Sequence, residues 1–490
     1  MPMPDRLLAA ATTGGSADLP RTIEVLLDPA LGSIVELVAW RSGPEQLMVA
    51  NALGSARIGP DGHHPVHGRD PIARQDALAF AGADVEYADP HPPKDRNHYP
   101  LAAPRLLAAF ADRDRAPDVI VVHSDAHYWP ERGGHVGEHG SLSVLQSRAP
   151  WLLSGAGVSR RGVLPTSARV IDVAPTMLHL AGPTVPPDLD GRARTDLAGP
   201  GAEHVIGLLW DGANCSALLA GAADGTLPNV GRLLSAGCAL AGGAVAEFPS
   251  VTLTNHTSAL TGLTPGRHGI VHNAFFDRQL QRQVLANDAG TWHTACDLLR
   301  PAARTLWELA DCATACVNEP IDRGAGYSTF ALVRASGAHD GARSMRGGLA
   351  PASGDPHATR TWVEGDAAYA WSTQVDAMGL TQMLTLFGAD SPPRVCWWNT
   401  TLTDTGHHGG GAHSAEATAA LVDSDRRLGV FLDLLERRNL LGRSLFLLTA
   451  DHGSVAADPA CRGDWDEALA AAGLAVRDEA FGYLYLGVGG

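Results

Sequence analysis

Three short apolar segments, each running into an aspartate, constrain the fold of this chain more than any other feature. Residues 205–209 lead to Asp211, residues 395–398 to Asp404, and residues 444–448 to Asp451. Apolar runs of this length are typical of parallel strands that are buried on both faces. Because the carboxyl ends of parallel strands meet at one edge of a sheet, the three carboxylates are expected to lie together.

Helical patterns alternate with these strands along much of the chain. They cover residues 228–236, 366–387, 415–437 and 466–472. This alternation predicts an α/β fold with a mostly parallel sheet. A further strand at residues 119–122 leads toward His139, and the alternating pattern of residues 36–58 predicts a small hairpin or meander.

The composition limits the class of protein and its partners. A chain of 490 residues with 45% hydrophobic and 18% charged residues is long enough for one large globular domain or two to three ordinary ones. The formal net charge of −16, from 37 basic and 53 acidic residues, argues against a nucleic acid polymer as partner. A small molecule is the better expectation.

The cysteines and apolar runs bear on the compartment. Seven cysteines without a disulfide spacing favour a reducing environment. The apolar run at residues 7–11 is too short for a signal-peptide core, and no stretch approaches the ~20 apolar residues of a membrane span. We therefore expect a cytoplasmic protein without a membrane partner.

A scattered set of metal-ligating residue types accompanies the strand ends. The set consists of three aspartates, three histidines and one hydroxyl: Asp211, Asp404, Asp451, His139, His408, His452 and Thr252. These groups are enough to hold two divalent cations around a nucleophile. Carboxylates combined with imidazoles suit zinc, with manganese as the alternative.

The segment at residues 248–257 carries the candidate nucleophile. A turn opens there into a short helix, and a hydroxyl at a helix N-terminus lies in a positive field beside free backbone N–H groups. That setting favours an alkoxide and an arriving phosphate. A Ser or Thr at a helix start is usually only an N-cap, so this segment alone does not decide the matter.

The same segment and two others resemble a known family. Thr252-x-x-Asn255-His256, Thr261-Gly262 and His268-Gly269-Ile270 resemble the type I phosphodiesterase branch of the alkaline phosphatase superfamily, which includes nucleotide pyrophosphatases/phosphodiesterases and phosphonoacetate hydrolases. Residues 273–277 and 448–453 are especially similar to the phosphonoacetate hydrolases. The resemblance implies an alkaline phosphatase-like three-layer α/β/α fold with a mostly parallel central sheet and an inserted cap.

The resemblance also implies roles for individual residues. Thr252 would be the nucleophile, and Asn255 would donate a hydrogen bond to a phosphoryl oxygen. One metal would be bound by Asp211, Asp451, His452 and Thr252, and the other by Asp404, His408 and His139. The implied activity is metal-dependent hydrolysis of a phosphoric ester in a small phosphorus-containing substrate.

Several alternatives stay open at this point. Ser250 and Thr254 are rival hydroxyls, His407 rivals His408, and His135 rivals His139. His256 and His268 are expected to support the turn. A phosphonoacetate-type C–P hydrolase would need basic residues for a carboxylate, for which the candidates are Arg278, Arg282 and Arg323. A non-catalytic metal-binding protein is the third reading.

The order of the motifs differs from that of the family. In relatives a single His-Gly motif follows the Asp-His pair, whereas here the matching motif, residues 133–141, precedes all the others. The chain is therefore interpreted as a circular permutant, with His139 predicted to lie near Asp404 and with the chain ends close together. The alternative is an unrelated N-terminal domain of about 200 residues.

This interpretation predicts the domain boundaries. Residues 1–20 would be a disordered tail, and residues 21–197 the C-terminal part of the permuted catalytic domain. Residues 198–204 would link the old ends. Residues 205–276 and 389–490 would form the N-terminal part, with residues 277–388 as a cap that shapes substrate choice.

Overall fold

A central eight-stranded sheet organises the molecule. The computed structural model describes residues 17–79, 88–130, 133–288, 290–336 and 367–488. The strand order is β17 (Tyr327–Ser328), β16 (Thr314–Val317), β18 (Val395–Thr400), β11 (His204–Trp210), β19 (Ser444–Thr449), β8 (Trp151–Gly155), β12 (Gly237–Leu240) and β9 (Gly162–Leu164). Pairing is parallel from β17 to β19 and antiparallel around β8, so the prediction of a mostly parallel sheet is confirmed.

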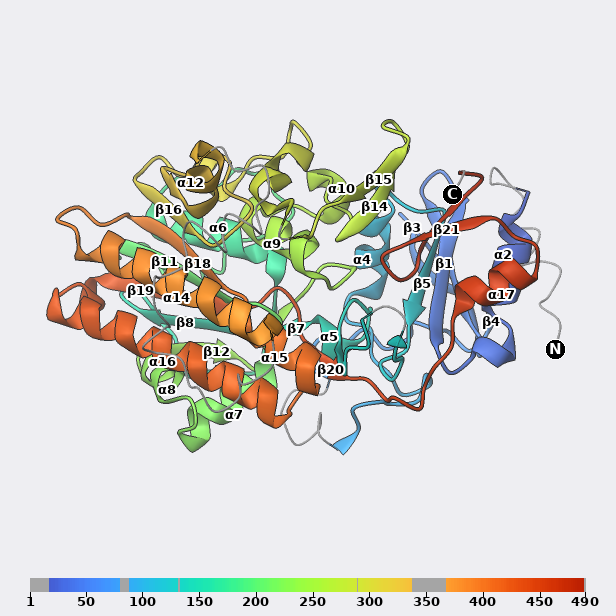
Figure 1. Ribbon diagram of the computed structural model, residues 1–490, viewed down its shortest axis with the longest axis horizontal. Helices are drawn as coiled ribbons and strands as arrows, with labels where there is room; N and C mark the ends of the chain where they lie inside the picture. Colours follow the sequence, from blue (N-terminus) through green and yellow to red (C-terminus); the bar gives the residue numbers. More distant parts are fainter. Residues whose placement is uncertain (1–16, 80–87, 131–132, 289, 337–366, 489–490) are drawn as a thin grey trace.

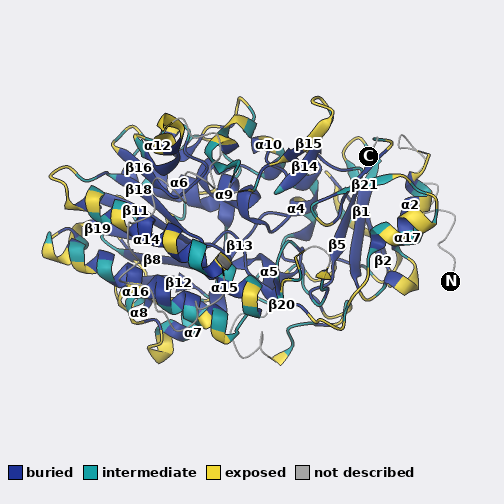
Figure 2. Cartoon of the chain, in the orientation of Figure 1, coloured by how far each residue is buried: buried dark blue, intermediate teal, exposed yellow. Residues whose placement is uncertain are grey.

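Helices cover both faces of this sheet, since every residue of β11, β18 and β19 is buried (Figure 2). The predicted helices are α8 (Pro228–Ser235), α14 (Ala367–Gly388), α16 (Ala415–Arg437) and α17 (Trp465–Ala471), each within one residue of its expected bounds. In α16 the Ser414 hydroxyl accepts a hydrogen bond from Ala417 N at 3.0 Å and caps the first turn. α6 (Val173–Ala181) contacts α9 (Thr252–Thr261) and β11.

A second sheet lies beside the first and is antiparallel throughout (Figure 1). Its order is β21 (Val476–Glu479), β22 (Tyr483–Leu486), β5 (Val119–His123), β1 (Val35–Gly43), β2 (Gln46–Asn51), β3 (Gly54–Gly59) and β4 (Gly62–Gly68). The meander predicted for residues 36–58 is confirmed as β1–β3. The predicted strand at residues 119–122 exists as β5, but it belongs to this sheet, because β1 and β22 pair with it.

Both ends of the described chain meet in the second sheet. Leu19 and Ile23 of α2 (Leu19–Leu26) are buried in one core cluster with Trp465 of α17 and Leu484 of β22. Of the predicted tail, residues 1–16 lie outside the described residues, and α2 already begins at Leu19.

Strands β8 and β9, which come early in the chain, contribute to the central sheet. β8 pairs with β19, and β9 pairs with β12. The segment at residues 198–204 runs along this region, where Gly199 N donates to Gly157 O at 3.0 Å and Glu203 N to Arg443 O at 2.8 Å. It leads directly into β11.

The predicted cap is wrong for part of its range. Strands β16 and β17 extend the central sheet, and α14 packs against β18. The hairpin of β14 (Ala274–Asp277) and β15 (Arg282–Leu285) stands apart from that sheet. Residues 337–366, the Gly/Ser-rich part of the predicted cap, lie outside the described residues.

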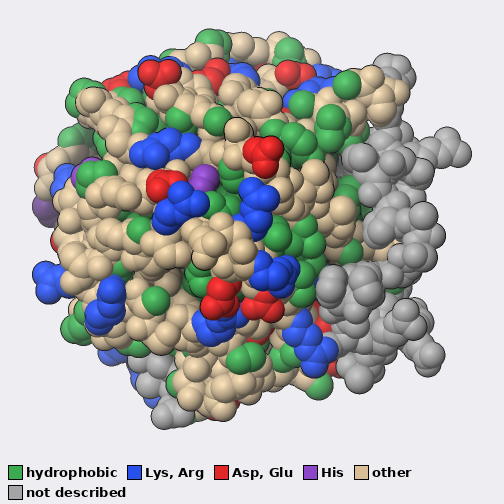
Figure 3. All heavy atoms as spheres, turned by 90° about the vertical axis from the view of Figure 1, so that its left-hand side faces the viewer, with side chains coloured by type: hydrophobic (Ala, Val, Ile, Leu, Met, Phe, Trp, Pro, Cys, Tyr) green, Lys and Arg blue, Asp and Glu red, His purple; other side chains and the backbone are tan. Residues whose placement is uncertain are grey.

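Shorter elements complete the connections. They are α4 (Ala102–Ala109), α5 (Val144–Ser147), α7 (Cys215–Asp224), α10 (Pro265–His268), α11 (Leu306–Leu309), α12 (Thr329–Ala335), α15 (Leu402–Gly410), β6 (Gly137–Glu138), β7 (Arg148–Ala149), β10 (Ala168–Arg169), β13 (Ala244–Val245) and β20 (Val455–Ala456). No helix among the described residues has both the length and the apolar composition needed to cross a bilayer. On the face shown in Figure 3, basic and acidic side chains are interspersed.

Candidate active site

Three neighbouring strands of the central sheet deliver the three aspartates to one place. Asp211 follows β11, Asp404 lies in the first turn of α15 after β18, and Asp451 follows β19. Because β18, β11 and β19 are adjacent and parallel, their carboxyl ends share one edge. The structure thus brings together the carboxylates that the sequence pattern singled out.

Asp211, Asp451 and His452 form one group that could hold a metal ion, with candidate ligand atoms within 4.8 Å of one another. His452 Nε2 lies 3.1 Å from Asp451 Oδ2 and 3.7 Å from Asp211 Oδ1. Thr252 Oγ1 lies 3.5 Å from the same imidazole nitrogen. The hydroxyl therefore borders this group.

A second group consists of Asp404, His408 and His139, also within 4.8 Å. His408 Nε2 is 3.3 Å from Asp404 Oδ2, and His139 Nε2 is 3.9 Å from Asp404 Oδ1. The His139 ring stacks on the His452 ring with 3.8 Å between centroids, so the two groups are neighbours. A residue from the first third of the chain thus lies among residues from the last third.

All three histidines present the same ring nitrogen to the site. The Nδ1 atoms of His139, His408 and His452 lie 3.1, 2.8 and 2.9 Å from the carbonyl oxygens of Ser250, Gly137 and Gly453. An Nδ1–H that donates to a backbone carbonyl fixes the tautomer and leaves the Nε2 lone pair free. That arrangement is the one in which neutral imidazoles bind metal ions.

The aspartates also fit a pair of cations. Asp211 Oδ1, Asp404 Oδ1 and Asp451 Oδ2 are buried and have no hydrogen-bond partner among the described residues. Burying an ionised carboxylate oxygen without a partner is costly, and a divalent cation between such oxygens offsets that cost. The donor set of carboxylates and imidazoles suits zinc or manganese.

The pKa values of these groups show how strongly the site favours positive charge. Burial raises the pKa of Asp211 well above its usual range, and the nearby carboxylates of Asp451 and Asp404 raise it further. Burial lowers the pKa of His408, but the Asp404 carboxylate outweighs this effect and brings it to about 9. The pKa of His452 is raised in the same way by Asp451. A metal ion would displace these protons.

A buried chain of charges lies behind the first group and was missed by sequence reasoning. His256 Nδ1 is 2.9 Å from Glu319 Oε2, and its Nε2 is 3.7 Å from Asp211 Oδ2 and 3.6 Å from Asp451 Oδ2. Trp397 Nε1 donates to the same Glu319 oxygen at 3.1 Å. His256 thus faces the carboxylates. Glu319 lies in the segment interpreted as a cap, where nothing marked it as a partner.

Among the rival hydroxyls, Thr252 alone lines the cavity at the site. It is the first residue of α9, and Val251 occupies the N-cap position, where its side chain cannot accept a hydrogen bond. Leu253 N donates to Asn273 Oδ1 and Asn255 N to Val251 O, so within the described first turn the N–H groups of Thr252 and Thr254 remain available to an anion. Ser250 Oγ donates to Ser141 O, and Thr254 is fully buried.

The role predicted for Asn255 is wrong in this structure. Its side chain is fully buried, its Oδ1 accepts from Glu247 N at 2.7 Å, and its Nδ2 donates to Pro249 O at 3.0 Å and Val251 O at 3.1 Å. These bonds hold the turn before α9, so the amide is not available to a substrate.

Asn273 occupies the place expected for Asn255. It lines the cavity beside Thr252, and its Oδ1 accepts from Leu253 N at 3.0 Å, which leaves the Nδ2 amide to donate to a ligand. The signal that could have found it is its position just after His268-Gly269-Ile270, at the start of the segment 273–277 that resembles the phosphonoacetate hydrolases.

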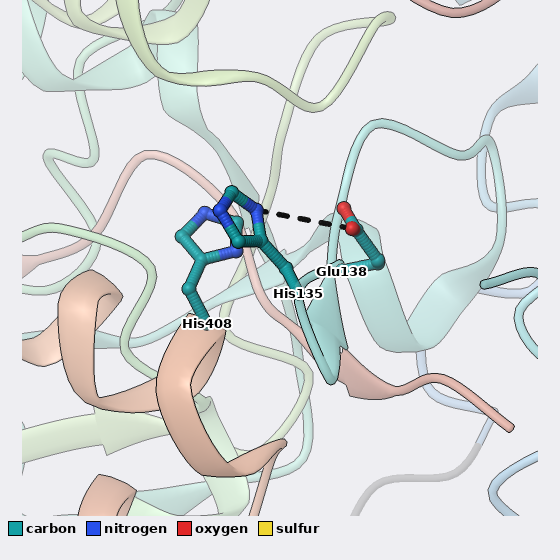
Figure 4. Close-up of side chains that lie close together, drawn as sticks. All are labelled: His135, Glu138 and His408. Atoms are coloured by element: carbon teal, nitrogen blue, oxygen red, sulfur yellow. Dashed lines mark ion pairs between the residues drawn. The ribbon is translucent and has the colours of Figure 1, made fainter. Parts of the chain in front are cut away.

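The structure distinguishes His407 from His408, and His135 from His139, by their positions relative to Asp404. His407 Nδ1 lies 2.6 Å from Thr403 O, and His407 belongs to none of the metal-capable groups among the described residues. His135 lies on the outer side of His408, where its Nδ1 is 3.9 Å from Glu138 Oε1 (Figure 4). His135, Glu138 and His408 could also hold an ion, but this outer group lacks Asp404.

A cavity of about 210 Å³ opens onto Thr252, Asp404 and His408. None of the arginines considered for carboxylate binding lines it. Arg278 pairs with Asp118 at 3.0 Å, Arg323 pairs with Glu308 at 2.9 Å, and Arg282 is exposed on β15. The structure therefore gives these arginines no place at the site.

A family model matches more than half of this chain. The family model described as type I phosphodiesterase / nucleotide pyrophosphatase matches residues 205–488. Among solved structures, the chain is similar to murine ectonucleotide pyrophosphatase/phosphodiesterase 5 bound to AMP, at 18% identity and a TM-score of 0.33 over 51% of this chain and 57% of that one. It is also similar to phosphonoacetate hydrolase from Sinorhizobium meliloti bound to phosphonoformate, at 23% identity and a TM-score of 0.35 over 54% and 59%.

A curated relative matches over a short stretch. A Caenorhabditis elegans protein described as a homolog of the extracellular sulfatase Sulf-1 is 32% identical over 78 residues, which are 15% of this chain and 11% of that protein. The chain thus spans less than two thirds of the length of each of these three proteins.

Proposed function

Because this chain belongs to the type I phosphodiesterase/nucleotide pyrophosphatase family, we propose that it is a metal-dependent hydrolase of phosphoric esters with Thr252 as nucleophile. One observation carries this proposal. Thr252 lines the cavity at the N-terminus of α9, and its Oγ1 lies 3.5 Å from His452 Nε2. A hydroxyl in that position can meet a phosphorus atom whose oxygens face the free N–H groups of the helix.

The residues fall into two metal sites in this proposal. Asp211, Asp451 and His452 would hold one cation together with Thr252, and Asp404, His408 and His139 the other, with zinc as the first choice and manganese as the second. Two such cations supply charge that polarises phosphoryl oxygens and lowers the pKa of a bound hydroxyl.

The protein's own groups then perform the following steps. Thr252 gives its hydroxyl proton to water, and its oxygen forms a bond to phosphorus while the bond from phosphorus to the leaving alcohol oxygen breaks. The departing oxygen takes up a proton from water. Asn273 Nδ2 and the backbone N–H groups of α9 donate to the equatorial oxygens as charge builds. Water then forms a bond to phosphorus while the bond from phosphorus to the Thr252 oxygen breaks, and a proton of that water returns to Thr252 as the phosphate product leaves.

Turnover of bis-p-nitrophenyl phosphate by the zinc-loaded protein tests the proposal. Thr252→Ala should lose at least about three orders of magnitude in kcat/KM, because it removes the nucleophile. Thr254→Ala, two residues along the same helix, is the matched control for disturbance of α9. Near-normal turnover by Thr252→Ala would assign the chemistry to another group.

A second candidate activity, C–P bond hydrolysis of phosphonoacetate, belongs in the same assay. The described residues lining the cavity include no Lys or Arg to bind its carboxylate. Ester hydrolysis is therefore expected to exceed phosphonoacetate hydrolysis. The reverse order would favour the phosphonoacetate reading.

We also propose that the chain is a circular permutant, with residues 198–204 joining the old ends. Two observations support this: His139 lies with Asp404 and His408, and α2 shares a core cluster with β22. A chain in which residues 205–490 precede residues 1–197, joined by a short linker, should fold and bind two metal ions. Failure of that chain to fold would count against the permutation.

The seven cysteines support a reducing, cytoplasmic location as a further part of the proposal. All seven are free thiols. Cys312 and Cys316, four residues apart, are therefore not bridged. Cell fractionation that recovers the protein outside the cytosolic fraction would contradict this location.

A further inference from the structure

The base of the β14–β15 hairpin forms part of the cavity wall beside the candidate nucleophile. His272 and Asn273 lead into β14, Asn287 follows β15, and all three line the cavity. Asn273 O accepts from Ala286 N at 2.8 Å and from Asn287 N at 2.9 Å, so the two ends of the hairpin are held together. The hairpin contacts β21 of the second sheet, and Leu253 N of α9 donates to Asn273 Oδ1, so its base is fixed from both sides (Figure 1).

His272 and Asn287 form a cross-strand pair at this base. The hairpin pairs Ala274 with Leu285 and keeps that register along both strands. Continued past the strand ends, the same register places His272 opposite Asn287. Side chains of directly opposed residues in an antiparallel pair lie on the same face. The two side chains are therefore neighbours on one wall of the cavity.

The tautomer of His272 is set by the backbone of the next residue. Asn273 N donates to His272 Nδ1 at 2.8 Å, so this nitrogen carries a lone pair. Burial lowers the pKa of His272 to about 3, and nearby His123 lowers it further, so the ring is neutral near pH 7. The single ring proton is therefore on Nε2, which has no acceptor among the described residues.

The orientation of the Asn287 amide follows from its partner in the same way. Trp292 Nε1, which can only donate, lies 2.7 Å from Asn287 Oδ1. The acceptor end of the amide is thus engaged, and the Nδ2 donor end has no acceptor in the part of the chain that the structure describes. His272 and Asn287 together offer N–H donors to the cavity.

The surroundings of these donors favour an uncharged acceptor on the ligand. The described lining residues include no Lys or Arg, and His272 is neutral. A second anionic group on the ligand would therefore meet no basic side chain at this wall. A carbonyl oxygen carries no charge and has two lone pairs, so it can accept from both donors.

We propose that His272 Nε2 and Asn287 Nδ2 donate hydrogen bonds to an uncharged acceptor oxygen, such as a carbonyl, in one ester group of a phosphodiester. The inference rests on the proposed function and narrows its substrate class. Asn273 donates to the phosphoryl oxygens in that proposal, so the neighbouring donors meet atoms of the ester group next to phosphorus. They position the substrate and take no part in bond making or breaking.

Binding to a variant that cannot turn the ligand over tests this donor pair apart from the chemistry. Zinc-loaded Thr252→Ala protein would be titrated calorimetrically with methyl acetonyl phosphate and with methyl methallyl phosphate. The two diesters have the same charge and similar shape, and differ in a carbonyl oxygen that is replaced by a methylene group. We expect the carbonyl compound to bind about fivefold more tightly, because the methylene group leaves both donors without an acceptor.

Substitutions in that background locate the preference. His272→Leu removes one donor and should lower the ratio of the two affinities about twofold to threefold, whereas His272→Gln, whose amide nitrogen can replace Nε2, should retain most of it. Asn287→Asp keeps the oxygen that accepts from Trp292 but removes the donor, and should also lower the ratio. Leu285→Ala truncates a 48% exposed side chain at the end of β15 and is the matched control, which should leave the ratio unchanged.

Each outcome decides either the donor pair or the nucleophile. Equal binding of the two diesters, or a ratio that neither His272→Leu nor Asn287→Asp lowers, would overturn the donor pair even where turnover depends on Thr252. An equal fall of the ratio in Leu285→Ala would also overturn it, because a disturbed hairpin would then explain the effect. Turnover that does not depend on Thr252 would refute the proposed nucleophile, and the binding ratio would still decide the donor pair.

Discussion

Replacing His139 tests most directly whether the first third of the chain supplies a metal ligand. His139 Nε2 lies 3.9 Å from Asp404 Oδ1, and its Nδ1 is fixed by Ser250 O. His139→Ala leaves Asp404 and His408 as the only two protein ligands of that group. We therefore expect the variant to retain about one zinc per chain where the wild type retains about two.

The expected size of the effect on stability follows from mass action. A cation that binds only the folded state, at a free concentration 100 times its Kd, stabilises that state by about 2.7 kcal/mol, so two sites contribute about 5.4 kcal/mol. Unfolding of a 490-residue chain carries an entropy of about 1.0 kcal/mol/K, at about 2.1 cal/mol/K per residue. Zinc should therefore raise the Tm of the wild type by about 5 °C and that of His139→Ala by about half as much.

Calorimetry of metal-free and zinc-loaded protein measures both shifts, and elemental analysis gives the stoichiometry. His135→Ala is the matched control, because it truncates the other histidine of the same loop, on the outer side of His408. It should keep the full zinc-dependent shift. A full shift in His139→Ala together with a halved shift in His135→Ala would refute the assignment and move the ion to the outer group.

Three further predictions address the substrate contact, the buried charge and the core. Asn273→Ala should lower kcat/KM for bis-p-nitrophenyl phosphate about 10- to 100-fold without changing zinc stoichiometry, because it removes one donor to the phosphoryl oxygens. Burial raises the pKa of Asp125 from 3.8 to about 7, so the folded state binds the proton more tightly, and stability is lost as the pH rises from about 4 through 7. Asp125→Asn should remove up to about 4 kcal/mol of that loss in the free energy of unfolding, measured by urea unfolding across this pH range. An unchanged pH dependence of the free energy of unfolding would contradict this prediction. Gly207→Ala should destabilise the protein by about 1–3 kcal/mol in the same assay, because the added Cβ would lie 2.1 Å from the Trp397 ring; wild-type stability would contradict this.

Much of the central sheet and of the metal groups could be predicted from local patterns. Strands β11, β18 and β19 are apolar runs that end near aspartates, and α16 has the bounds that its periodicity indicated. Such patterns are local because a strand buried on both faces needs apolar residues in sequence, and a metal site needs carboxylates and imidazoles of particular chemistry. The residue types of the site were therefore visible without the fold.

Which groups contact each side chain, and which strands pair, was in contrast decided only by the tertiary structure. Asn255 has the residue type of a substrate donor, yet the turn before α9 brings backbone groups of Glu247, Pro249 and Val251 to its amide. Strand β5 has the pattern of a buried parallel strand, yet it pairs antiparallel with β1 and β22. Which groups meet a side chain depends on segments far away in sequence.

The metal ligands could be recognised from local sequence, whereas the contacts made in the rest of the cavity could not. Sequence by itself determined that three aspartates and three histidines were available, since they lie in four short motifs. The fold alone placed Glu319 behind His256 and set Phe481 against Trp129 in the lining of the cavity. Aromatic and charged side chains carry no local mark of their partners, because those contacts arise only when two sheets pack side by side.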